Sequence, residues 1–153
     1  KDHHDHFLNG AIFEVYDKTA DAYVTTLASG QLMITGEEKD EEYEISKKED
    51  FSKVIKTVKT DENKQVVLDI DDGTYYSRKV GDDKVTKHVV KDGKAVLVDA
   101  IYGHEYEFKE IKAPTSYQLA DKSKAYKVEA DEETDTIIYY FENARIVVPN
   151  TGV

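Results

Sequence analysis

The side-chain composition of the chain favours β-structure over helix. Val, Ile and Thr number 16, 10 and 12 residues against six Leu, and 11 Tyr and five Phe accompany a single Met. β-Branched and aromatic side chains fit a pleated, half-buried surface, whereas helical cores are usually rich in Leu, Ala and Met. Most of the glycines stand between strand-like segments, where turns are expected. The sequence therefore predicts a mostly β protein.

Alternation of apolar and polar residues locates the strands. Residues 11–16 alternate, which places Ala11, Phe13 and Val15 on one face. A hairpin about Ser29-Gly30 is predicted from two neighbouring strand-like segments, 22–27 and 31–35. Further strands are predicted in the segments 64–76, 85–90, 94–110, 126–128 and 136–143. About eight to ten strands in one domain suggest a β-sandwich.

One segment has helical periodicity. Ser46 and Glu49 fit a capping box. Four apolar side chains then follow at the spacing i, i+3, i+4 and i+7, namely Phe51, Val54, Ile55 and Val58. The pattern predicts one amphipathic helix at about residues 47–59, lying against the sheet.

The sequence also contains a weak internal echo. Residues 64–76 align without gaps on residues 94–106, and each copy has the pattern of a strand, a glycine turn and a second strand. A solenoid needs about three repeats or more. A recurring hairpin is therefore the better interpretation of two copies.

Charge and cysteine content exclude several classes of function. The 153 residues carry a formal net charge of -11, which disfavours nucleic acid and anionic membranes as partners. With no cysteine, the chain has no disulfide, no thiolate zinc site and no thiol nucleophile. We expect no cofactor.

Three polar segments resemble metal sites but have simpler interpretations. Residues 3–6 (His-His-Asp-His) and the charged run 37–42 are predicted to be solvated loops. Residues 69–73 look like the start of a calcium loop, but Val80 stands where the twelfth-position Glu should be. A tight turn is predicted there, and no metal site is expected.

Two polar residues fall on predicted core faces. Alternation places Glu110 on the same face as Tyr106 and Phe108. Asn143 likewise shares a face with Ile137, Tyr139 and Phe141. Either these two residues lie at strand ends with their heads in water, or they are buried. A buried carboxylate needs a partner or a proton, and desolvation raises a carboxyl pKa while lowering that of an amine. A buried Glu beside a Lys and an Asn is equipped to form a Lys–Asn isopeptide bond.

Four segments stand out along the chain: residues 10–17 (GAIFEVYD), 110–117 (EIKAPTSY), 141–143 (FEN) and 148–152 (VPNTG). In this order, from first strand to terminus, they resemble motifs of the B-type domains of Gram-positive collagen adhesins and sortase-assembled pilins. The matching motifs of the family are its first-strand GAxFxVYD, its ExxAPxGY motif, its last strand and the LPxTG sorting signal. The chain departs from the family at Ser116, where Gly is usual, and at Val148, where Leu is usual. The resemblance covers residues 1–36 and 94–152 well.

The resemblance implies specific roles for several residues. Glu110 matches the family's catalytic glutamate and Asn143 its acceptor amide. Lys1, nine residues before Gly10, is the best match for the donor lysine. Cleavage by a sortase would fall within the sorting signal, which comprises Val148, Pro149, Asn150, Thr151 and Gly152.

The resemblance also implies an architecture and a location. We expect an Ig-like or prealbumin-like β-sandwich over residues 1–147, with an insertion at about 37–90 and a sorting peptide at 148–153. The expected protein is a structural pilin or wall-anchored subunit outside a Gram-positive cell, and not an enzyme. Its expected partners are a sortase and neighbouring pilin subunits or peptidoglycan. An alternative is a module in which the inserted helix region binds a host protein or glycan.

Overall fold

In the computed structural model, residues 9–114, 117, 126–129 and 137–139 are described. Every regular element in these ranges is a β-strand, and the strand pairings are antiparallel. The strands are β1 (Ile12–Asp17), β2 (Ala22–Ala28), β3 (Gln31–Thr35), β4 (Glu42–Ser46), β5 (Val54–Lys59), β6 (Gln65–Asp69), β7 (Gly73–Lys79), β8 (Thr86–Val90), β9 (Ala95–Leu97), β10 (Glu105–Lys112), β11 (Tyr126–Glu129) and β12 (Ile137–Tyr139). The prediction of a mostly β protein is confirmed.

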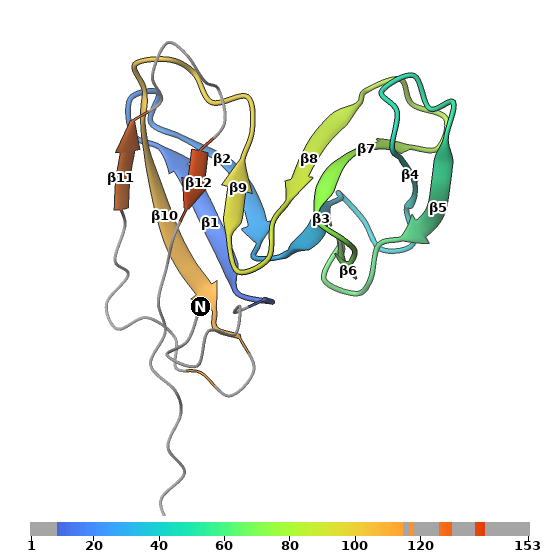
Figure 1. The fold of residues 1–153 in the computed structure, drawn as a ribbon, viewed down its shortest axis with the longest axis horizontal. Helices are drawn as coiled ribbons and strands as arrows, with labels where there is room; N and C mark the ends of the chain where they lie inside the picture. Colours follow the sequence, from blue (N-terminus) through green and yellow to red (C-terminus); the bar gives the residue numbers. More distant parts are fainter. Residues whose placement is uncertain (1–8, 115–116, 118–125, 130–136, 140–153) are drawn as a thin grey trace, which may run out of the picture.

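The strands gather into two lobes, which lie side by side in Figure 1. Lobe 1 contains the four-stranded sheet β11-β10-β1-β2 and the two-stranded sheet β12-β9. Lobe 2 contains the four-stranded sheet β5-β4-β7-β8 and the two-stranded sheet β3-β6. Lobe 2 spans residues 31–90 and is inserted between β2 and β9 of lobe 1. It includes the segment 37–90, in which the sequence predicts an insertion.

Each lobe has its own hydrophobic core between its two sheets. In lobe 1 the core residues include Phe13, Val15, Tyr106 and Phe108 from the larger sheet and Ala95, Leu97 and Ile137 from the smaller one. In lobe 2 they include Ile45, Tyr75 and Val90 from the larger sheet and Leu32, Ile34 and Val66 from the smaller one. Two sheets that share a core in this way are consistent with a β-sandwich.

The two lobes have the same strand topology. Strands β3, β4, β5, β6, β7 and β8 correspond in order to β12, β1, β2, β9, β10 and β11. This correspondence converts the sheet orders β5-β4-β7-β8 and β3-β6 into β2-β1-β10-β11 and β12-β9, which are the orders of lobe 1. The chain enters the common topology at a different strand in each lobe. The topology of lobe 2 is therefore a circular permutation of that of lobe 1.

The sequence echo falls on equivalent strands of the two lobes. Residues 64–76 contain β6 and the start of β7, and residues 94–106 contain β9 and the start of β10. In each copy the first strand belongs to the two-stranded sheet and the second to the four-stranded sheet. The prediction of two hairpins is therefore wrong, because each glycine turn carries the chain from one sheet to the other.

A buried tyrosine fixes each of these two corners. The Tyr75 hydroxyl donates a hydrogen bond to the carbonyl of Asp71 at 2.7 Å. The Tyr106 hydroxyl accepts one from the N–H of Ile101, also at 2.7 Å. Both tyrosines are 2% exposed. Each one therefore buries its ring near the start of a strand, while its hydroxyl forms a hydrogen bond with the backbone of the preceding loop.

The predicted hairpin about Ser29-Gly30 is also wrong, because β2 pairs with β1 whereas β3 pairs with β6. Buried Ser29 instead bonds twice to Ala11: its N–H donates to the Ala11 carbonyl, and its hydroxyl accepts from the Ala11 N–H. Gly30 donates to the Lys94 carbonyl at 3.0 Å. Gly30 has φ +64°, and a Cβ there would lie 1.9 Å from Asn9 Oδ1. The glycine thus lets the chain cross between lobes.

The predicted helix at 47–59 is wrong as well. Residues 54–59 form β5, an edge strand paired with β4. The Ser46 hydroxyl donates to the Lys53 carbonyl, which closes a loop instead of capping a helix. Phe51 has φ +59°, outside helical geometry, and packs under the Arg78 guanidinium at 4.1 Å. The β-branched residues of 54–58 prefer a strand, and the neighbouring strand β4 supplies the partner that periodicity cannot reveal.

Other strand predictions agree with the structure. Segments 11–16, 85–90 and 126–128 correspond to β1, β8 and β11. Segment 136–143 is described only at β12, which pairs with β9.

The separate cores lead to a stability prediction. Ile45→Ala should destabilise lobe 2 by about 2–5 kcal/mol, because Ile45 is fully buried and truncation leaves a cavity. Hydrogen exchange should show lost protection in β4 and β7, with smaller losses in β1 and β10. Ile55→Ala, at a position 40% exposed on β5, is the matched control and should have little effect. Equal loss of protection in both lobes would contradict independent cores.

Candidate functional site

Strand β10 carries the buried glutamate. Its burial alternates, with Tyr106, Phe108 and Glu110 buried and the intervening Lys109 exposed. Glu110 is 7% exposed. Of the two alternatives that the sequence left open for Glu110, burial is therefore the one that agrees with the structure.

Two aromatic residues of the core flank Glu110 in the sheet. In the pairing of β1 with β10, Phe13 stands opposite Glu110. Phe13 and Phe108 are almost completely buried in the core of lobe 1. The pairing register shifts between Ile12 and Phe13, so a strand irregularity lies directly beside the carboxyl group. Such irregularities re-aim side chains and are frequent next to functional groups.

A hydrogen bond between Pro114 and Tyr117 follows the end of β10. Pro114 is buried, and its carbonyl accepts a hydrogen bond from the N–H of Tyr117 at 3.0 Å. These are the Pro and Tyr of the ExxAPxGY-like segment. The turn therefore starts four residues after Glu110.

The remaining predicted site residues lie outside the described ranges. These are Lys1, Asn143 and the sorting-signal residues Val148, Pro149, Asn150, Thr151 and Gly152. The last strand is predicted to turn Ile137 toward the core. This agrees with the structure, because Ile137 is 4% exposed and belongs to the core of lobe 1.

The first-strand motif ends in a buried carboxylate that sequence reasoning did not single out. Asp17 is 4% exposed, accepts the Ala20 N–H, and lies 2.7 Å from His104 Nδ1. Because a carboxylate only accepts, Nδ1 carries the proton. Burial raises the pKa of Asp17, but these hydrogen bonds outweigh it and the pKa is lowered overall. The pair ties the end of β1 to the loop before β10.

The acidic segments have structural roles. Glu41, in the charged run, accepts the N–H groups of Glu37 and Glu38 and binds Lys79 Nζ at 2.7 Å. The hydrogen bond from Lys79 is the main reason that the pKa of Glu41 is lowered to about 2. Within residues 9–114 and the other described positions, no three His, Asp or Glu residues converge on a metal site. Residues 3–6 lie outside those positions.

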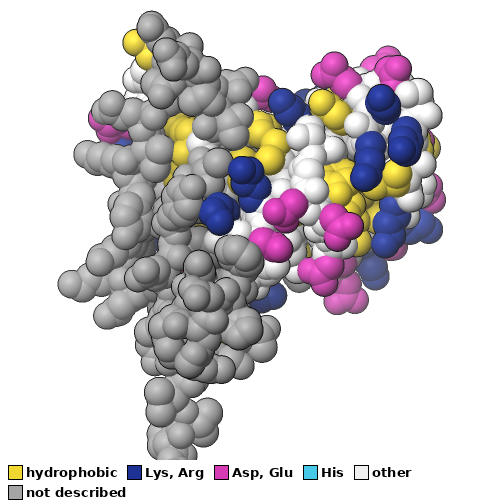
Figure 2. All heavy atoms as spheres, viewed as in Figure 1, with side chains coloured by type: hydrophobic (Ala, Val, Ile, Leu, Met, Phe, Trp, Pro, Cys, Tyr) yellow, Lys and Arg dark blue, Asp and Glu magenta, His cyan; other side chains and the backbone are white. Residues whose placement is uncertain are grey.

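Mixed charges cover the face of lobe 2. Figure 2 shows basic and acidic side chains interspersed there around a hydrophobic area. No helix in the described residues is long and apolar enough to cross a membrane.

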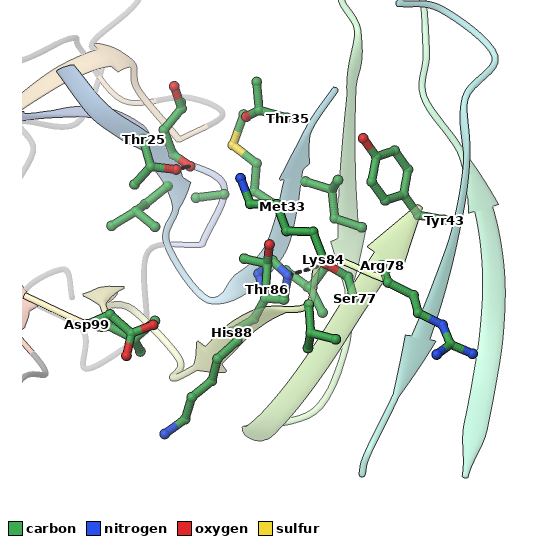
Figure 3. Close-up of a pocket in the computed structure, with 18 of the residues that line it drawn as sticks. Thr25, Met33, Thr35, Tyr43, Ser77, Arg78, Lys84, Thr86, His88 and Asp99 are labelled. Atoms are coloured by element: carbon green, nitrogen blue, oxygen red, sulfur yellow. Dashed lines mark hydrogen bonds between the residues drawn. The ribbon is translucent and has the colours of Figure 1, made fainter. Parts of the chain in front are cut away.

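A cleft of about 690 Å³ lies between the lobes, and sequence reasoning missed it. Lobe 1 contributes residues 23–28 and 96–99, and lobe 2 contributes parts of β3, β4, β7 and β8. In Figure 3, Thr25 and Asp99 face the lobe 2 residues Met33 and Thr86 across the opening. The cleft depends on residues more than 70 positions apart, so no local pattern could reveal it.

His88 occupies the lobe 2 wall of this cleft. Its Nε2 lies 2.7 Å from the hydroxyl of Ser77, which is 2% exposed. Desolvation lowers the pKa of His88 to about 4. The imidazole is therefore neutral at physiological pH and acts as a hydrogen-bonding wall residue, not as a cation.

Comparison with protein-family models, curated proteins and solved structures finds no match.

The lowered pKa of His88 predicts a pH dependence. Between pH 6.5 and about 4, the unfolded state binds a proton at His88 and the folded state does not. The free energy of unfolding should therefore decrease as the pH is lowered through this window. The contribution of His88 to this decrease is at most about 1.4 kcal/mol per pH unit. Denaturant titrations should show a shallower fall for His88→Gln. Identical slopes in the two proteins would contradict the assignment.

Proposed function

We propose that the chain is a structural domain of a sortase-assembled pilin or wall-anchored surface protein, stabilised by a self-formed isopeptide bond. The observation that carries the proposal is the burial of Glu110 among the aromatic side chains of the lobe 1 core. Burying a carboxylate without a partner or a proton costs several kcal/mol of folding free energy. Removing one partner of a buried ion pair costs about 3–5 kcal/mol. The finer fold assignment, an Ig-like or prealbumin-like B-type sandwich, belongs to the same proposal.

The proposed reaction joins Lys1 to Asn143. The neutral lysine amine attacks the side-chain carbonyl carbon of Asn143, and a new C–N bond forms. Glu110 accepts the proton that the amine loses and passes it to the departing amide nitrogen, which leaves as ammonia. The reaction turns over once, so the domain is not an enzyme. The bond would tie the two ends of the chain together and restrict the unfolded state, as a disulfide does.

The segment Val148–Gly152 has a separate role in the proposal. A sortase would cleave between Thr151 and Gly152 and transfer the Thr151 carbonyl to an amine of a neighbouring subunit or of peptidoglycan. The protein would then be displayed outside a Gram-positive cell.

A second candidate function is recognition of a host protein or glycan by the inserted segment. The observation that favours it is that residues 31–90 form a lobe with its own core and border a cleft. The helix expected in this segment is absent from residues 31–90. Any recognition would use strands and loops.

Intact-mass measurement tests the cross-link. The wild-type chain should weigh one ammonia less than its sequence, and Glu110→Ala or Asn143→Ala should restore the full mass. Glu107→Ala is the matched control, since Glu107 lies on the same strand but forms a surface ion pair with Lys18. That variant should retain the mass deficit.

A full sequence mass for the wild-type chain would reject the bond. Peptide mapping that joined Asn143 to a lysine other than Lys1 would reject only the assignment of Lys1.

A further inference from the structure

The cleft between the lobes is lined by two outer strands. It contacts every residue from 23 to 28, from 31 to 35 and from 84 to 89. These runs include most of β2 in lobe 1 and most of β8 in lobe 2. β2 and β8 are terminal strands of their sheets in the described residues, with β1 and β7 as their respective partners.

Edge strands offer unpaired main-chain groups to another strand. An extended peptide that adds to such an edge obtains a ladder of hydrogen bonds, while alternate side chains enter neighbouring pockets. We propose that the cleft binds an extended peptide as an added strand on the outer edge of β8, with an acidic side chain directed to Lys84 and Lys87. This binding does not depend on the proposed cross-link.

The charges on the lobe 2 wall support an acidic peptide. Lys84 and Lys87 are exposed, and no ion pair involves them within the described part of the chain. Figure 3 shows Lys84 beside Met33 on this wall. The other two basic residues of the cleft are already engaged: Lys79 binds Glu41, and Arg78 pairs with Glu44.

The carboxylates of the cleft set the orientation of the peptide. The Asp82 carboxylate accepts the N–H of Lys84, at the start of the β8 wall. Asp99 lies on the opposite wall, in lobe 1. An acidic side chain is therefore favoured beside the lysine ammonium groups and disfavoured beside the carboxylates of Asp82 and Asp99. Glu37 and Glu41, on the loop before β4, complete the charged lining.

The same charges argue against a second copy of the chain as the occupant. Two β8 edges paired with each other would bring lysines close to lysines, and like charges on adjacent strands destabilise a pair. Thr25, Thr86 and Ser77 add hydroxyl groups, and Met33 adds an apolar floor. This mixture suits a peptide with alternating polar and apolar side chains.

The test is a selection of random hexapeptides displayed against the whole chain, with the double variant K84E/K87E as counter-selection target. Enriched peptides should carry Asp or Glu more often than the starting library does. Labelled synthetic copies should lose affinity about tenfold or more with K84E/K87E, a change measured by fluorescence anisotropy. The variant K53E/K56E makes the same charge change at and before β5, away from the cleft, and should bind like the wild type.

Backbone methylation separates main-chain from side-chain recognition. Methylating alternate amides of a selected peptide should weaken binding about tenfold for the set that faces β8, because those N–H groups are then lost to the ladder. Full affinity with each of the two sets methylated in turn would overturn the proposal. So would a selection that enriches no peptide on the wild type over K84E/K87E, or a concentration-dependent dimer that the same double variant abolishes.

Discussion

Hydrogen bonds at the crossing point between the lobes fix both connections of the chain between them. Ser29 bonds twice to Ala11, and Gly30 bonds to Lys94, so the chain leaving lobe 1 and the chain returning to it meet at one place. Asn9 reinforces this meeting by accepting the N–H of Gly93. Because both crossings are fixed there, lobe 2 can be inserted as a complete unit while the sheets of lobe 1 stay paired.

Because the two lobes share one topology, the residues at equivalent positions can be compared. When the buried corner residues Tyr75 and Tyr106 are matched, Lys79 corresponds to Glu110. Glu110 stands opposite Phe13 in lobe 1, and Lys79 stands opposite Tyr43 in lobe 2. At the equivalent position, lobe 2 therefore has a lysine that is ion-paired at its surface, where lobe 1 has a buried carboxyl group. The chemistry proposed for lobe 1 has no counterpart at this position of lobe 2, whose distinctive feature is the cleft edge.

Local sequence patterns predicted strands well and their partners poorly. Alternation located β1 and the inward face of β10, including the burial of Glu110, because a half-buried strand imposes a period of two. The same reasoning paired β2 with β3 and failed, since a short glycine turn is equally suited to a hairpin and to a crossing between sheets. The helix at 47–59 failed because three or four apolar residues at helical spacing also occur by chance in a β-branched edge strand.

By itself, the sequence determined the β class, the positions of most strands and the buried face on which Glu110 lies, since these follow from the side-chain preferences of neighbouring residues. Only the tertiary structure decided that there are two lobes, that their topologies match by circular permutation, and that a cleft lies between them. The pairings that create these features join residues tens of positions apart, as β1 joins β10. Such pairings are selected by the packing of whole cores, and no short window of sequence contains that information.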